Sequence, residues 1–128
     1  MGKISEADLE AAQRSIASTL RKNEKVYVTL SQKQSPRASQ LKMVANAIDN
    51  FGVMLIVIEN AQKQKAPVAL QREKLEAVYK AIPSYIEQIE KIKPKFQEGT
   101  PQHTLAVRRI DAYDIALKLI EDELQFLK

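Results

Sequence analysis

One stretch of the chain, Leu41–Ile58, is so apolar that most of it must be hidden from water. Its second half, from Val53 to Ile58, is apolar on every side, which is typical of a buried helix. Asp49 and Asn50 interrupt the run, and it is shorter than the roughly 20 apolar residues that span a bilayer. We therefore expect no membrane insertion. Steps of three and four place six residues on the core-facing side: Leu41, Val44, Ala45, Ile48, Phe51 and Leu55.

A second interpretation of this region competes with the helical one. Val53–Ile58 is rich in β-branched residues, Gly52 could end a helix just before it, and Lys25–Leu30 alternates as a half-buried strand does. These segments could form a strand–helix–strand unit. We favour the all-helical interpretation, because a sheet of two strands is marginally stable and the sequence offers no third strand.

The composition fits a single all-α domain over residues 1–128. A chain of this length can bury a core without disulfides or metal ions. The chain has no Cys, which excludes disulfides and thiolate chemistry, and its first residues lack the apolar segment of a signal peptide. We therefore expect a cytoplasmic protein. Glu, Lys, Gln, Ala and Leu are plentiful, and they favour helices.

Capping residues predict where the first two helices begin. Ser5 is followed by an apolar stripe and predicts a helix over residues 5–31. Ser35-Pro36 predicts the start of a second helix, because proline is well tolerated at the first helical position. This helix should run to residue 62 and contain Gly52, where we expect another helix to cross closely.

The second half of the chain predicts two more helices. Pro67 should begin the third, and its apolar stripe crosses Pro83 without a change of period, which predicts a kink at Pro83. Thr100-Pro101 should begin the fourth. Short connectors favour antiparallel neighbours, so we expect an up-down-up-down antiparallel four-helix bundle. The fourth helix has a seam of heptad spacing: Ala106, Ile110, Tyr113, Leu117, Ile120, Leu124 and Leu127.

No sequence motif indicates catalysis or a bound cofactor. The chain contains no Gly-rich phosphate loop and no nucleophile elbow, and His103 is its only histidine. Asp111 and Asp114 lie one helical turn apart, but neighbouring Arg and Lys residues can pair with them. We therefore expect no enzyme, no cofactor and no metal site.

Charge is unevenly distributed along the chain. The last predicted helix is acidic from Ile110 onward, and its end carries Glu121, Asp122 and Glu123, where the helix dipole disfavours negative charge. A basic partner surface would explain this placement, on another chain or elsewhere on this one. The first helix and its connector are basic and could contact phosphate groups or complement the acidic helix; the candidate residues are Arg14, Arg21, Lys22, Lys25, Lys33 and Arg37.

The last helix also carries apolar residues off its seam. Ile115 and Phe126 are three helical turns apart and would form a second strip. An exposed strip of this kind often marks an interface. We predict that Ile115 and Phe126, with Glu121 and Asp122 beside them, contact a protein partner or a second copy in a homodimer.

These observations predict a non-catalytic helical-bundle protein-interaction module, such as a small regulator, an adaptor, a chaperone or an immunity-type protein. The alternative is an accessory protein that binds nucleic acid through the basic first helix and connector. The two differ in salt dependence, because phosphate contacts lose affinity steeply as salt rises.

Overall fold

The structure is a computed structural model that describes residues 4–127. No strand occurs in this part of the chain, so the strand–helix–strand interpretation is wrong and the all-α fold is confirmed. A short 3-10 helix, η1 (Lys93–Lys95), follows the third of four α-helices: α1 (Glu6–Ser31), α2 (Ala38–Gln62), α3 (Arg72–Ile92) and α4 (Pro101–Phe126).

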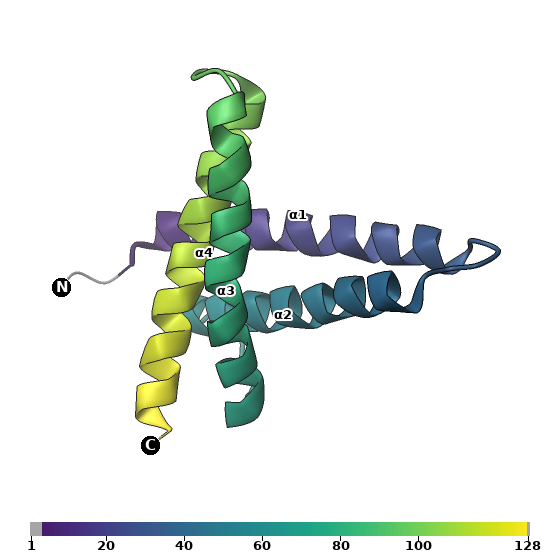
Figure 1. Cartoon of the computed structure of the whole chain (residues 1–128). Coiled ribbons are helices and arrows are strands. Elements are labelled where there is room, and N and C mark those ends of the chain that lie inside the picture. Colours follow the sequence, from purple (N-terminus) through teal and green to yellow (C-terminus); the bar gives the residue numbers. More distant parts are fainter. Residues whose placement is uncertain (1–3, 128) are drawn as a thin grey trace.

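The four helices form two hairpins, α1–α2 and α3–α4. Figure 1 shows the α3–α4 hairpin laid across the α1–α2 hairpin. Helices α2 and α4 each contact the other three helices, whereas the backbones of α1 and α3 do not approach each other in the described residues. The predicted four-helix bundle is confirmed, with α2 and α4 joining its two halves.

Two of the predicted helix starts are confirmed by their caps. The Ser5 hydroxyl accepts a hydrogen bond from the Asp8 N–H at 3.1 Å, and the Thr100 hydroxyl accepts one from the His103 N–H at 3.3 Å. Such bonds satisfy N–H groups that have no partner inside the helix. The predicted start at Ser35-Pro36 is wrong, because Arg37 remains extended and α2 begins at Ala38.

The predicted helix start at Pro67 is also wrong. The side chain of Asn60, near the end of α2, donates to the Val68 carbonyl and accepts from the Val68 N–H, both at 2.9 Å. These two bonds tie the connector to α2 and occupy backbone groups that a helix would need, so α3 begins only at Arg72. Helix α3 then continues through Pro83 as predicted; the kink there stays a prediction.

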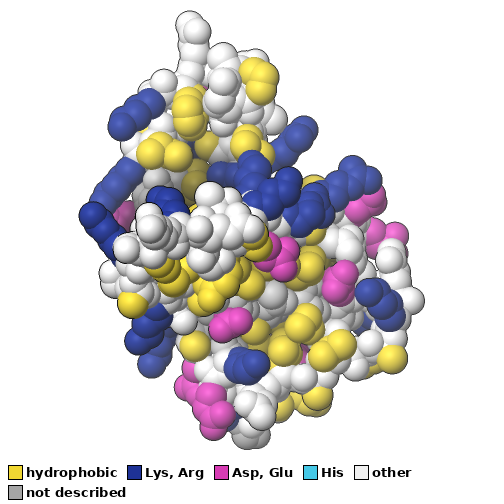
Figure 2. Space-filling model, turned by 90° about the vertical axis from the view of Figure 1, so that its right-hand side faces the viewer, with side chains coloured by type: hydrophobic (Ala, Val, Ile, Leu, Met, Phe, Trp, Pro, Cys, Tyr) yellow, Lys and Arg dark blue, Asp and Glu magenta, His cyan; other side chains and the backbone are white. Residues whose placement is uncertain are grey.

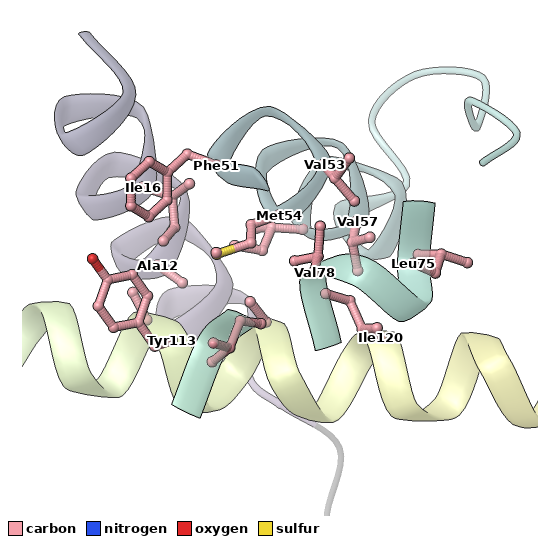
Figure 3. Close-up of a cluster of buried hydrophobic side chains, with 14 of the residues drawn as sticks. Ala12, Ile16, Phe51, Val53, Met54, Val57, Leu75, Val78, Tyr113 and Ile120 are labelled. Atoms are coloured by element: carbon pink, nitrogen blue, oxygen red, sulfur yellow. The ribbon is translucent and has the colours of Figure 1, made fainter. Parts of the chain in front are cut away.

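The core is built around the second half of α2, as its sequence predicts. Phe51, Met54 and Ile58 are buried there in one cluster with apolar side chains from the other three helices. Figure 3 shows Phe51 and Met54 among side chains such as Ile16, Val78 and Tyr113. Leu55, predicted to face the core, is only partly buried. It lies one helical step, about 100°, from Met54 and therefore reaches the edge of the cluster.

Helix α4 faces the core with small as well as large side chains. Tyr113 and Ile120 are buried as the seam predicts, but Leu127 is exposed and Leu117 is only partly buried. Ala112 and Ala116, which lie outside the predicted seam, are fully buried. Because α4 contacts three helices, its buried face is broader than a two-helix seam and is centred differently.

Helix α2 is the described helix that is long and apolar enough to cross a membrane by length and composition. With 25 residues it exceeds the apolar run that the sequence singled out. Core helices of globular proteins meet the same criteria, and α2 packs against α1, α3 and α4. The absence of membrane insertion stays a prediction.

We expect Met54→Ala to lower the free energy of unfolding by about 2–5 kcal/mol, the range for deleting a large buried side chain. Met54 is fully buried, so the substitution leaves a cavity. Leu55→Ala is the matched control and should cost clearly less, because Leu55 already contacts solvent. Urea denaturation of both variants provides the measurement. An equal or larger loss for Leu55→Ala would show that the core lies on the Leu55 side of α2 and not on the Met54 side.

Gly52 lies inside α2, but no helix crosses closely there, contrary to our expectation. A Cβ atom added at Gly52 would meet nothing within 4 Å. Glycine costs about 0.5–1 kcal/mol in a helix relative to alanine. Gly52→Ala should therefore raise the free energy of unfolding by about this amount, measured by denaturation. Lower stability in this variant would mean that another segment contacts the site.

Candidate functional site

The far half of the α1–α2 hairpin extends beyond the α3–α4 hairpin (Figure 1). We call residues 21–43 the arm; they comprise the end of α1, the connector and the start of α2. Leu30 is the one buried residue among them, and it does not belong to the core cluster. The arm is therefore a surface element that the rest of the fold leaves uncovered.

The arm concentrates positive charge. Glu24 is its only acidic residue, and no ion pair joins any arm residue to an acidic group in the described chain. Figure 2, which faces the end of the arm, shows Lys and Arg side chains gathered around it. Unpaired charges of one sign make the arm attractive to an acidic ligand. The basic residues are Arg21, Lys22, Lys25, Lys33, Arg37 and Lys42.

Arg14, which the sequence placed in the same basic group, is separate from it. Its guanidinium pairs with the Glu10 carboxylate one turn earlier on α1. The alternative in which the basic first helix complements acidic α4 within the bundle gains no support from direct ion pairs. No ion pair joins α1 to α4 in residues 4–127; the helices meet at a face where Ala12, Ile16 and Ala116 are buried.

The arm also exposes large apolar side chains that the sequence analysis did not single out. Met43 is 66% exposed and Val28 is 52% exposed, and Val26 and Tyr27 are also exposed. Hydrophobic side chains lie between the charged ones in Figure 2. Tyr27 belongs to the apolar stripe that predicted the first helix. Its exposure could not be read from that stripe, because it depends on how much of the α1–α2 hairpin α3 and α4 cover.

A small pocket lies where the arm joins the body. This corner pocket has a volume of about 290 Å³ and is lined by residues of all four helices. Two larger grooves, of about 720 and 620 Å³, border α2, but their charged rims are exposed and mixed in sign. No Asp or Glu lines the corner pocket, and Arg109 is its one charged residue.

Three aromatic rings form one wall of the corner pocket. The ring centroid of Phe51 lies 4.9 Å from that of Tyr85 and 6.1 Å from that of Tyr113. The Tyr85 hydroxyl accepts a hydrogen bond from the Asn50 side chain at 2.9 Å. Rings at these distances pack favourably against one another, so this wall of the pocket is formed by the fold itself.

Tyr113, Arg109 and the exposed Gln88 line this pocket and form no side-chain hydrogen bond or ion pair within the described chain. Tyr113 is 3% exposed, but its hydroxyl keeps contact with solvent at the pocket. In Figure 3 this hydroxyl lies at the edge of the buried cluster and points away from Met54 and Ile120. Arg109 lies four residues earlier, on the same helical face. It is partly buried and forms no ion pair in residues 4–127.

Burial raises the pKa of the Tyr113 hydroxyl, because a phenolate is poorly solvated there. The positive charge of Arg109 acts in the opposite direction, and Tyr85 raises the pKa slightly further. The net shift is upward, so the hydroxyl keeps its proton at neutral pH and can donate a hydrogen bond. The sequence signal for this site is an arginine one turn before a buried tyrosine.

Of the proposed partner-binding residues on α4, Glu121, Asp122 and Phe126 lie in the last turns of that helix, and Ile115 lies near its middle. Phe126 is 84% exposed, but Ile115 is partly buried and packs against the core, so the two do not form the expected exposed strip. Glu121 is partly buried, and the Asp122 carboxylate lies 3.4 Å from the Lys118 ammonium. Partner binding at this end, and a homodimer through it, stay predictions.

Asp111 and Asp114 do not assemble a recognisable metal site. No group of three or more His, Asp or Glu side chains able to hold a metal ion occurs in the described residues. Partial burial raises the pKa of Asp114, and the negative charges of Asp111 and Glu90 raise it further. His103 stands apart in the first turn of α4.

Comparison with protein-family models, with curated proteins and with solved structures gives no match.

Because its pKa is raised, folded Asp114 binds a proton more tightly than the unfolded chain does. Its ionisation therefore opposes folding, and its contribution to stability falls as pH rises through the region above 3.8. Asp114→Asn should remove this loss, so its stability advantage over the wild type should be larger at pH 7 than at pH 3. Thermal unfolding at both pH values gives the comparison. Asp122→Asn, which breaks an exposed ion pair, should bring no such gain.

Proposed function

We propose that the protein is a non-catalytic interaction module whose arm binds a partner protein through an acidic, partly apolar segment. The observation that carries this proposal is the combination on the arm of unpaired basic residues and exposed apolar side chains. It is compatible with the regulator, adaptor, chaperone and immunity-type roles, and a cytoplasmic location remains part of the proposal.

The apolar residues favour a protein over nucleic acid as the partner. Exposed Val28 and Met43 would gain by leaving water against another apolar surface, which phosphates and sugars do not provide. Methionine and tyrosine are enriched at protein interfaces, and the arm exposes one of each. The basic residues would select acidic partners and speed their approach.

The rest of the described chain supports a binding role rather than catalysis. Its charged side chains mostly stand alone or in exposed pairs one helical turn apart, as in Arg72–Glu76 and Lys91–Glu87. A catalytic site needs a nucleophile or a general base held against a partner group. The corner pocket offers donors and a positive charge, which suit recognition.

Photo-crosslinking in cells tests the proposal. The photoreactive amino acid p-benzoylphenylalanine replaces Met43, and the cells that produce this variant are irradiated. We expect a discrete crosslinked polypeptide whose captured segment combines Asp or Glu with apolar residues. The matched control places the same group at Val68, which is 54% exposed in the α2–α3 connector. That position should give no such product.

Charge reversal on the arm separates the two classes of partner. Lys25→Glu with Lys42→Glu should abolish the crosslink at Met43 and leave the thermal unfolding midpoint nearly unchanged, because both lysines are exposed. The product should resist nuclease. Disappearance after nuclease treatment would instead establish the nucleic-acid alternative. Equal crosslinking at Val68 would show that the arm has no special role.

A further inference from the structure

We infer that the corner pocket is a carboxylate-binding site, which receives an Asp or Glu side chain of the partner segment. The site rests on Arg109 as the positive charge and on the Tyr113 hydroxyl as a hydrogen-bond donor. The identity of the occupant rests on the proposed function, whereas the chemistry of the site rests on the pocket alone.

The unused hydroxyl of Tyr113 is the strongest reason for a ligand. The ring of Tyr113 is buried, but its hydroxyl keeps contact with solvent at the pocket and forms no hydrogen bond within the described chain. This hydroxyl is therefore free to donate to a ligand, whereas phenylalanine at the same position would offer the pocket no donor. A tyrosine at this position suits an acceptor that enters the pocket from outside.

Arg109 defines the charge of the expected acceptor. Its guanidinium can donate two parallel hydrogen bonds to a carboxylate, an arrangement that is stronger than a single neutral bond. The Tyr85 hydroxyl accepts from Asn50 and keeps its own proton free to donate to the same ligand. Three donors and no acidic side chain therefore line one pocket, and this arrangement favours an anionic ligand over a cationic one.

The size and lining of the pocket favour a carboxylate on a short apolar body. The apolar part of the wall includes Met43, Phe51 and Ile89, and the volume of about 290 Å³ is at the lower limit for a small-molecule site. A phosphate group normally recruits several cations or a helix N-terminus, and Arg109 is the single cation here. Met43 also belongs to the arm, so one partner segment can contact both.

Titration with 3-phenylpropionate tests the site, with the uncharged 3-phenylpropionamide as the matched ligand. Proton–nitrogen spectra of the ¹⁵N-labelled protein should show saturable shifts at the Arg109 Nε–H group and at the amides of Asn23 and Tyr113. The amide should bind at least tenfold more weakly, because it lacks the charge that pairs with Arg109. Inorganic phosphate should not compete at equal concentration.

Three variants decide which groups are responsible. Arg109→Gln and Tyr113→Phe should each weaken 3-phenylpropionate binding at least tenfold. Arg108→Gln is the matched control, because Arg108 is exposed and lies outside the corner pocket, and it should bind as the wild type does. Tyr113→Phe should leave the thermal unfolding midpoint nearly unchanged, since the hydroxyl that it removes contacts solvent and has no partner in the described chain.

Equal binding of acid and amide, or wild-type binding by Tyr113→Phe, would overturn the carboxylate site. Effective competition by phosphate would replace it with a phosphate site. These outcomes are separate from the crosslinking result. Binding of the acid without a Met43 crosslink would retain the site and reject the arm proposal, whereas a crosslink without binding would do the reverse.

Discussion

The rest of this structure depends on covering the second half of α2. Met54 and Ile58 are fully buried, and Phe51, Val53 and Val57 are nearly so, which means that α2 needs neighbours on several sides. Helix α1 lies alongside it, and the α3–α4 hairpin is laid across the pair. A hairpin of two helices could shield only one side of such a helix, so the crossing hairpin follows from the apolar character of α2.

The crossing in turn determines where the surface is available for binding. Ala12 on α1 and Ala112 and Ala116 on α4 are almost completely buried, and small side chains at a contact let two helices approach closely. Because α3 and α4 cover only part of the α1–α2 hairpin, the arm remains outside. The corner pocket forms at the junction, where Arg109 from α4 lies beside arm residues.

Much of this fold could be predicted from local patterns. Ser5 and Thr100 are caps whose signal lies within four residues, and the burial of Val53–Ile58 follows from its composition. The start of α3 could not be predicted, because it depends on the Asn60 side chain, which binds the backbone of Val68 eight residues further along the chain.

The candidate site depends on contacts between residues that are still further apart in the sequence. The basic residues are visible in the sequence, but the pairing of Arg14, the partial burial of Ile115 and the meeting of Arg109 with the arm follow from packing between distant segments.

The arm also has consequences for local stability. Leu30 and Val44 are buried outside the core cluster, so the end of the α1–α2 hairpin has only a small apolar contact area of its own. Regions with few buried contacts open at a lower free energy than the core does. Backbone amides near the connector can therefore exchange with solvent through local fraying while those around Met54 require opening of the whole bundle. A ligand that contacts both the arm and α4 would couple local fraying of the arm to opening of the whole bundle. Its binding would slow amide exchange at the far end of the α1–α2 hairpin.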